Sequence, residues 1–390
     1  QFPWGNDPMR SLIAVVALIQ GALGARVLLR FLATSKGTRI RKTARISADA
    51  GAITVILPVL DEAHRIQPAL DGLHNQGEEV REILVVDGGS NDGTQALVET
   101  AAASDPRVRL VDASPVPAGV NGKAWGLHVG LDHAHADTRW ILTIDADVRL
   151  QPALSRSLLS HAEREDVPVL SAATLQSISG PALGLVHPSM LTTLVYRFGI
   201  PGSVTTSVSR IQANGQCFLI RRDVLAAIGG FAGVLGSVCE DVTLARRAAA
   251  AGYSVGFHET EHLVRAEMYA GAADAWRNWS RSLPMRDALT RRSSIVGLAE
   301  VFAVQALPLW LLPVSLRTRG TRHPWTIINA VLVMTRFGVL AGTSRAYVNR
   351  PWTYALSPLL DLPVALQISR MAFRRTHVWR GREFAPGVSQ

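Results

Sequence analysis

The stretch ILVVDGGSNDGT, residues 83–94, decides how this chain folds. Its four apolar residues, three of them β-branched, predict a buried strand, and Asp87 stands at the carboxyl end of that strand, before a glycine-rich turn. The letters NDGT at its end are typical of a helix start, so Asp92 is best explained as a helix cap. A strand that leads through such a turn into a helix is the first half of a βαβ unit.

The same alternation continues on both sides of this stretch, from residue 52 to residue 265. The apolar, β-branched runs predict strands at ITVILPVL (53–60), REILVVD (81–87), VRLVDA (108–113), WILTID (140–145) and VPVLSAAT (167–174). Helical patterns cover residues 62–76, 92–103, 122–135 and 152–164. We therefore expect an α/β fold with a mostly parallel sheet and helices on both of its faces.

Acidic residues follow three of these strands. Asp61 and Glu62 come after the first, Asp87 after the second, and Asp145 and Asp147 end the fourth. The carboxyl ends of parallel strands open into one ligand crevice. In an extended chain, residues two apart point the same way, so Asp145 and Asp147 would present both carboxylates to one spot. Mg²⁺ and Mn²⁺ prefer such oxygen ligands, completed by phosphates and water. The alternative is a pair of turn or cap acids before helix 152–164.

Two further candidates lie at predicted helix starts. Lys123, one of only three lysines, stands beside Gly119 and Gly122 and could reach a phosphate, although a solvated surface lysine is an equal alternative. Glu240 and Asp241 begin the pattern DVTLARRAAAAG, where acids are ordinarily caps and dipole partners. A carboxylate fixed there would also suit a general base that accepts the proton of an attacking hydroxyl.

The composition indicates contact with lipid. Of the 390 residues 48% are hydrophobic and 18% charged, and the mean hydropathy is +0.17. The net charge of +9 comes largely from arginines that flank apolar segments, which favours anionic headgroups over nucleic acid as the partner. Cys217 and Cys239 show neither metal-ligand nor disulfide spacing.

The apolar segments predict a membrane topology. Residues 11–33 are long enough to cross a bilayer, and the basic residues follow them, so we expect residues 1–35 to be an anchor with its amino end outside. Residues 266–294 contain a helix with Trp276 and Trp279 on one side, which either lies in the headgroup layer or packs on the core.

Three more apolar stretches lie within residues 295–370, before a basic cytoplasmic tail at 371–390. The first, 296–316, carries Pro308 and Pro313, so we expect it to re-enter or to lie flat. The other two, 325–343 and 352–369, are expected to cross. The result would be a multi-pass protein of the cell membrane with a cytoplasmic catalytic domain at 52–265.

The ordered motifs ILPVLDE, VVDGGSNDGT, GKAWGL, IDAD, NGQCFLIRRDVLAAIGGF and EDVTLARR resemble glycosyltransferase family 2, the inverting enzymes with a GT-A fold, over about residues 52–290. The resemblance implies that Asp145 and Asp147 hold a divalent cation and that Asp241 is the catalytic base. It implies a nucleotide site at Pro58, Asp61, Glu62, Asp87, Lys123 and Asp145. It also implies a donor-sugar or acceptor pocket at Asn214, Gly215, Gln216, Glu240, Trp279 and Arg281, with diphosphate contacts from Arg277, Arg281, Trp379 or Arg380.

The later motifs RAEMY (265–269), WRNWSR (276–281) and WRGR (379–382) are similar to membrane members that glycosylate lipids, such as ceramide glucosyltransferases and bacterial carotenoid- and hopanoid-associated enzymes. Two departures stand out. Many relatives have paired aspartates where this chain has Asp87-Gly88, and processive synthases carry a Gln/Arg-x-x-Arg-Trp motif that WRNWSR does not match.

The resemblance therefore implies the transfer of one hexose, with a UDP-sugar as the expected donor, to the hydroxyl of a membrane lipid. The alternatives are transfer to a polyprenyl phosphate, which needs no base, a processive polysaccharide synthase, and a non-catalytic membrane protein that binds nucleotide sugars. The sequence does not decide the sugar, the lipid, the oligomeric state, or Mg²⁺ against Mn²⁺.

Overall fold

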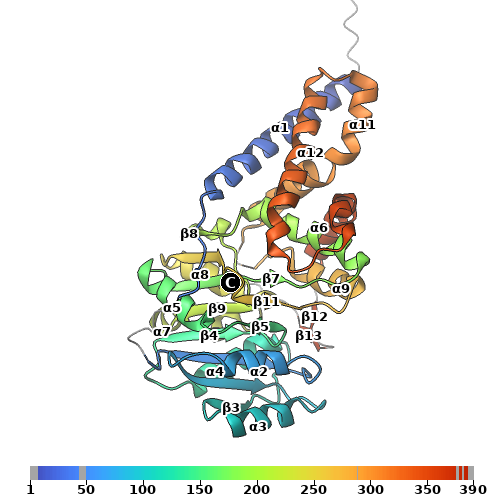
Figure 1. The fold of residues 1–390 in the computed structure, drawn as a ribbon. Helices are drawn as coiled ribbons and strands as arrows, with labels where there is room; N and C mark the ends of the chain where they lie inside the picture. Colours follow the sequence, from blue (N-terminus) through green and yellow to red (C-terminus); the bar gives the residue numbers. More distant parts are fainter. Residues whose placement is uncertain (1–7, 44–49, 288, 375–376, 380–381, 385–390) are drawn as a thin grey trace, which may run out of the picture.

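The computed structural model describes residues 8–43, 50–287, 289–374, 377–379 and 382–384. An eight-stranded sheet occupies the lower part of Figure 1, in the order β3-β2-β1-β4-β9-β6-β10-β8. Its strands are β1 Ile53–Val59, β2 Val80–Asp87, β3 Val108–Asp112, β4 Trp140–Ile144, β6 Val169–Ala173, β8 Ser203–Thr205, β9 Cys217–Arg221 and β10 Val255–Glu259.

The predicted mostly parallel sheet is confirmed. Strands β3, β2, β1 and β4 run parallel to one another, as do β6 and β10. The sequence did not predict β10, nor β9, which lies antiparallel between β4 and β6, nor β8, which is antiparallel to β10. The apolar core of β9 is the short run Phe218–Ile220, and the strand leads directly into a helix, so its pattern is too brief to stand out.

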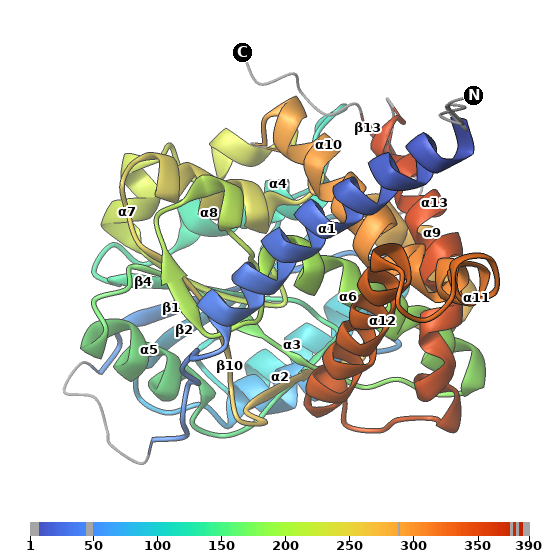
Figure 2. The same ribbon diagram turned by 90° about the horizontal axis from the view of Figure 1, so that it is seen from above.

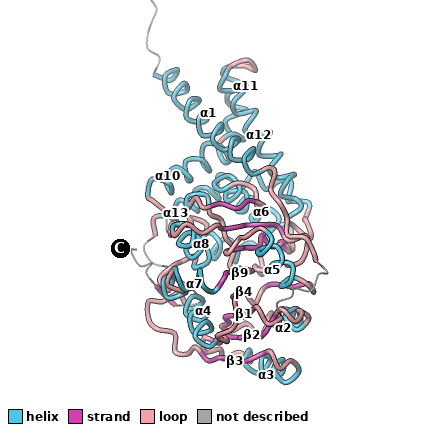
Figure 3. Tube along the Cα trace, turned by 90° about the vertical axis from the view of Figure 1, so that its left-hand side faces the viewer, coloured by secondary structure: helices cyan, strands magenta, loops and turns pink. Residues whose placement is uncertain are grey.

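Helices cover both faces of the sheet, as predicted (Figure 3). On one face lie α2 Gln67–His74, α3 Thr94–Ser104 and α5 Leu154–Arg164, and on the other α4 Gly122–His133, α7 Arg222–Ala227 and α8 Glu240–Ala250. Strand β1 has apolar side chains on both faces of the sheet. Val55 and Leu57 are buried with the helices of the first face, and Ile56 is buried with those of the second. A strand buried on both sides is apolar throughout rather than alternating.

A second, helical part extends from one side of the sheet (Figures 1 and 2). Its helices are α1 Pro8–Thr34, α6 Pro181–Phe198, α9 Ala272–Ser282, α10 Arg291–Glu300, the π-helix Val301–Ala306, α11 Pro308–Arg319, α12 Pro324–Thr343 and α13 Asp361–Ala372. The helix predicted within residues 266–294 is α9, which ends at Ser282 because Pro284 follows. Helix α6 packs with α9, α12 and α13 rather than on the sheet.

Two helices in the described residues are long and apolar enough to cross a membrane, Ser11–Thr34 and Pro324–Ala346. A third candidate is the pair 291–306 and 308–319, bent by 54° at a break next to Pro308. Such a bend occurs in broken spans and in re-entrant segments alike, so its path stays a prediction.

Residues 352–369 are not among the candidate spans in the described chain, so their crossing stays a prediction. This stretch folds as the 3₁₀-helix Trp352–Leu360, which is followed directly by α13. Pro358 lies inside the 3₁₀-helix, and Pro363 follows early in α13. Proline removes a backbone donor, which explains why one long helix does not form.

The remaining elements are short. A three-stranded sheet, β5 Val148–Leu150, β11 Val264–Ala266 and β7 Leu175–Gln176, lies beside the carboxyl end of β4. Strands β12 His377–Trp379 and β13 Arg382–Phe384 pair with each other. Further 3₁₀ turns span Val208–Arg210, Phe231–Val234 and Ser344–Ala346.

Candidate active site

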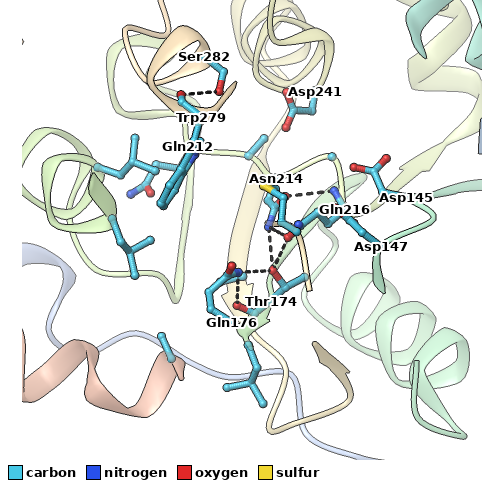
Figure 4. A pocket seen from close by; sticks show the side chains of 18 of the residues that line it. Asp145, Asp147, Thr174, Gln176, Gln212, Asn214, Gln216, Asp241, Trp279 and Ser282 are labelled. Carbon is cyan, nitrogen blue, oxygen red and sulfur yellow. Dashed lines mark hydrogen bonds between the residues drawn. The ribbon is translucent and has the colours of Figure 1, made fainter. Parts of the chain in front are cut away.

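One cavity of about 1470 Å³ lies between the sheet and the helical part. Asp145, Asp147 and Asp241 line it on the sheet side, and α6, α9 and α12 line it on the other. Figure 4 shows these three carboxylates around the side chains of Asn214 and Gln216, with Trp279 across the cavity. The structure therefore brings together carboxylates that lie far apart in the sequence.

Asp145 and Asp147 lie in the turn between β4 and β5, because β4 ends at Ile144. The predicted extended geometry is therefore wrong, although both side chains do line the cavity. Of the alternative reading as turn or cap acids, the turn is confirmed and the helix cap is wrong. Helix α5 begins at Leu154, and the residue before it, Ala153, makes no side-chain cap bond within the described chain.

Burial controls the charge of these two carboxylates. It raises the pKa of Asp145 to about 7, against the lowering effect of Lys123, and it raises the pKa of Asp147 as well. The buried Oδ1 of Asp147 has no hydrogen-bond partner within the described part of the chain. Two buried carboxylates, one with an unpaired oxygen, are a donor set that fits a divalent cation.

The described residues contain no group of three or more His, Cys, Asp or Glu side chains that could hold a metal ion. A cation at Asp145 and Asp147 would therefore take its other ligands from phosphate oxygens and water, as Mg²⁺ commonly does. Such a site would bind the cation well only together with a phosphate ligand.

Lys123 bridges two carboxylates. Its Nζ lies 2.7 Å from Oδ1 of Asp145 and 2.8 Å from Oε1 of Glu240. The backbone N–H of Lys123 donates to the side chain of Asn121, which caps α4. This cap fixes the start of the helix that carries the lysine. Because the side chain is only 17% exposed, the surface-lysine alternative is wrong. The two carboxylates raise the pKa of Lys123 against the effect of burial, so it stays charged.

Asp241 is the second residue of α8 and lines the cavity. Burial, and then the neighbouring Glu240, raise its pKa to about 6. Its carboxylate accepts a hydrogen bond from the backbone N–H of Gly215. A Cβ on Gly215 would lie 2.6 Å from Nζ of Lys123, so a larger residue there would push the ammonium away from its two carboxylates. Asp241 thus presents to the cavity a carboxylate whose pKa lies near neutrality, which is a group able to accept a proton.

Amide and hydroxyl groups form a second wall of the cavity (Figure 4). Oε1 of Gln216 accepts from Oγ1 of Thr174 at 2.6 Å and from Nδ2 of Asn214 at 3.0 Å. Gln176 donates to the same Thr174 hydroxyl at 2.9 Å. The buried Nε2 of Gln216 lacks a partner among the described residues, so this network retains one unused donor. Of these residues, Thr174 and Gln176 were not predicted as site residues.

The predicted nucleotide residues divide into two groups. Pro58 and Glu62 line the cavity. Asp87 and Asp61 are not among its lining residues in the described chain. Asp87 accepts from the backbone N–H groups of Gly89 and Ser90 and from Nε2 of Gln95, so its oxygens hold its own turn. Asp61 accepts from the backbone N–H of Asn91 at 2.9 Å in the same way. Their nucleotide contacts stay a prediction.

Aromatic rings surround Trp279. Its ring centroid lies 4.5 Å from that of His187 and 5.9 Å from that of Tyr269, and all three residues line the cavity. Arg281 also lines the cavity, whereas Arg277 is exposed and is absent from its lining within the described residues. The predicted diphosphate contacts from the side chain of Trp379 and from Arg380 lie outside the described residues.

Sequence reasoning missed Arg65. Its guanidinium pairs with Glu62 and lies 3.8 Å from Oδ2 of Asp147, so it joins the nucleotide side to the candidate metal carboxylates. These carboxylates raise its pKa against the effect of burial. The spacing from Glu62 to Arg65 was a local signal, but the contact with Asp147 joins distant parts of the chain.

Comparison with known proteins agrees with this geometry. Residues 54–229 match the family Glycosyl transferase family 2. The chain is 28% identical over 145 residues to the succinoglycan biosynthesis protein ExoO of Rhizobium meliloti (strain 1021). The aligned region covers 36% of this chain and 39% of that protein. The chain thus spans about two fifths of the curated relative it matches.

Among solved structures, one is similar in fold and a second gives a weaker match. A mannosyltransferase, PcManGT from Pyrobaculum calidifontis, in complex with GDP-Man and Mn²⁺, has a TM-score of 0.54 at 19% identity, over 93% of this chain and 98% of that chain. Glucosyl-3-phosphoglycerate synthase from Mycobacterium tuberculosis has a TM-score of 0.39 at 19% identity, over 70% and 85%.

The sheet, its paired helix layers and the cavity at the strand ends define a GT-A fold. Residues 54–229 thus match the family that the motifs resemble.

Proposed function

We propose that the protein transfers one hexose from a nucleotide-diphosphate sugar to the hydroxyl of a membrane lipid, with inversion at the anomeric carbon. The observation that carries the proposal is the composition of the cavity. Asp145, Asp147 and Asp241 line one end, while Phe31, Leu194 and Val339 of the apolar helices α1, α6 and α12 line the other. At about 1470 Å³ it exceeds the roughly 300–1,000 Å³ of a single-ligand pocket, which leaves room for two substrates.

The apolar helices support a lipid as the second substrate. Leu18 of α1 is 73% exposed and Met334 of α12 is 65% exposed, on helices long and apolar enough to cross a membrane. Large apolar side chains on the outside of such helices are stable in a hydrocarbon environment. A bilayer around α1 and α12 would bring lipid to the apolar end of the cavity, with the catalytic domain on the cytoplasmic side.

The donor would bind at the carboxyl ends of β1 and β4. Pro58 and Glu62 line this side, and the Lys123 ammonium would balance charge on the diphosphate. Asp145 and Asp147 would hold a divalent cation, which when bound supplies a positive charge to the departing nucleoside diphosphate. The complex of the mannosyltransferase PcManGT with GDP-Man and Mn²⁺ supports this assignment.

Asp241 would take the proton of the acceptor hydroxyl while that oxygen attacks the anomeric carbon. The new bond forms on the face opposite the diphosphate, the bond to the diphosphate oxygen breaks, and the sugar inverts. A pKa of about 6 leaves the Asp241 carboxylate mostly ionised at neutral pH while keeping it basic enough to accept a proton.

One observation favours a second acceptor class. Arg345 and Arg350 line the cavity where it meets the helical part, and guanidinium groups recognise phosphates. A lipid phosphate, such as a polyprenyl phosphate, is already anionic and needs no base. Asp241→Asn should abolish transfer to a hydroxyl and spare transfer to a phosphate, so this variant separates the two acceptors.

The test incubates detergent-solubilised protein and Mn²⁺ with labelled UDP-glucose or GDP-mannose and a total lipid extract. We expect one discrete glycolipid in the organic phase, absent with Asp241→Asn. A ladder of products would indicate a processive synthase. Nucleotide binding without transfer or hydrolysis would indicate a non-catalytic binding protein.

A further inference from the structure

The helix that carries Asp241 makes no cap of its own. Helix α8 begins at Glu240, and the residue before it, Cys239, makes no side-chain cap bond in the described chain. The first backbone N–H groups of a helix have no partner inside the helix, so they need an acceptor from elsewhere. Asp241 lies in this first turn, where a loose helix start would displace its carboxylate.

From a distant loop, Asp287 supplies an acceptor for Cys239, the N-cap residue of α8, and for Val238 before it. Its Oδ2 accepts from the backbone N–H of Val238 at 2.7 Å, from that of Cys239 at 3.1 Å, and from Oγ of Ser237 at 2.6 Å. Cys239 is 48 residues away in the sequence. Three bonds from consecutive residues to one carboxylate oxygen fix the chain just before α8, and a carboxylate there also complements the helix dipole.

Two buried arginines hold the loop Leu283–Asp287 in turn. Nη1 of Arg246, on α8, donates to the carbonyl oxygens of Met285 at 2.8 Å and Asp287 at 2.6 Å. Arg197, at the end of α6, donates through Nη1 and Nη2 to the carbonyl oxygens of Pro284 and Leu283.

The arginines also restrain the backbone of this loop. Both guanidinium groups lie near the ring of Phe198, at 5.0 Å for Arg197 and 5.8 Å for Arg246. Met285 has a left-handed φ of +46°, a conformation that needs such external support in a non-glycine residue.

The same loop continues from the cavity wall. Helix α9, which precedes it, contributes Trp279, Arg281 and Ser282 to the cavity, and the Cys239 thiol donates to the Ser282 carbonyl at 3.5 Å. We infer that Asp287 is a positioning residue for Asp241, which it holds against the cavity wall by capping α8 from the loop after α9. This inference rests on the proposed role of Asp241 as the base.

The experiment compares four variants with the wild-type protein: D287A, D287N, D241N and the double variant D287A/D241N. The control is D223A, because Asp223 accepts from the Val224 backbone N–H at 2.7 Å at the start of α7, away from the cavity. We expect D287A to lower kcat by roughly tenfold to a hundredfold, the effect of a misplaced catalytic group, at an unchanged donor KM. The acid limb of its pH profile should shift.

The asparagine variant keeps one acceptor oxygen, so D287N should recover part of the kcat that D287A loses. If D287A does not fold, D287N still tests the inference. D223A should retain wild-type kcat and the wild-type pH profile. In the D241N background, D287A should cause little further loss, because a positioning residue acts through the group it positions.

The outcomes separate the two claims. If D241N retains wild-type transfer, the base assignment fails whatever Asp287 does. Suppose instead that D241N abolishes most transfer while D287A lowers the residual rate of D241N by the same factor as it lowers the wild-type rate. In that case Asp287 acts independently of Asp241 and the inference is wrong. Equal losses in D287A and D223A, or wild-type kcat in both Asp287 variants, would also overturn it.

Discussion

Replacing Lys123 with methionine removes a positive charge that contacts both Asp145 and Glu240. The ammonium lies 2.7 and 2.8 Å from these carboxylates, and the three side chains are 17%, 23% and 8% exposed. Breaking a buried ion pair costs about 3–5 kcal/mol. Because nearly a quarter of Asp145 is exposed, we expect the lower end, about 3 kcal/mol at pH 7.5. In a chain of 390 residues, with an unfolding entropy of about 2.1 cal/mol/K per residue, that lowers the Tm by roughly 4 °C.

The loss of stability caused by K123M should be smaller at acidic pH. The pKa of Asp145 is raised to about 7 in the folded protein, so below that pH its carboxyl group becomes neutral and no longer requires a cation. Thermal unfolding of K123M at about pH 5 and pH 7.5 measures this difference. The matched control is R221M, whose pair with Asp223 is also 2.7 Å long but exposed, worth less than about 1 kcal/mol. Equal Tm losses in K123M and R221M, or a K123M loss independent of pH, would refute the reasoning.

Three further predictions follow from the site. The kcat for transfer should rise with pH through about 6, because the pKa of Asp241 is raised to about 6 and a base must be ionised; a flat profile would contradict its role. Asp147→Asn should weaken Mn²⁺ binding in the presence of nucleotide at least tenfold, measured by electron paramagnetic resonance, and an unchanged affinity would remove Asp147 from the metal site. Gly215→Ala should lower kcat by roughly a hundredfold, because its Cβ would lie 2.6 Å from Nζ of Lys123. The control, Gly271→Ala, should retain activity, because its Cβ would meet nothing within 4 Å. Similar losses of kcat in both variants would argue against this close packing.

The fold was largely predictable because local patterns determine it. Each of the five predicted strands, from ITVILPVL to VPVLSAAT, is present, and so are the four helices between them. The five residues of β9 follow no long apolar run, and their antiparallel pairing depends on contacts with β4 and β6. Pairing of this kind is a tertiary property that single-strand patterns do not contain.

The site was predictable as a set of residues but not as a geometry. Asp145, Asp147, Lys123 and Asp241 line one cavity, as expected from strand ends and helix starts. The turn after β4 and the role of Asp87 in its own loop were not predictable, because each depends on local hydrogen bonds. No sequence spacing indicates the contact of Arg65 with Asp147, since the two lie far apart in the chain.

The central claim is that one cavity lets a lipid hydroxyl displace the nucleoside diphosphate with Asp241 as the base. The most direct measurement is the nuclear magnetic resonance spectrum of the purified product made from an α-linked nucleotide sugar. The account predicts a single β-linked hexose joined to a lipid hydroxyl oxygen. An α-linked hexose, or no hexose on any lipid, would contradict it.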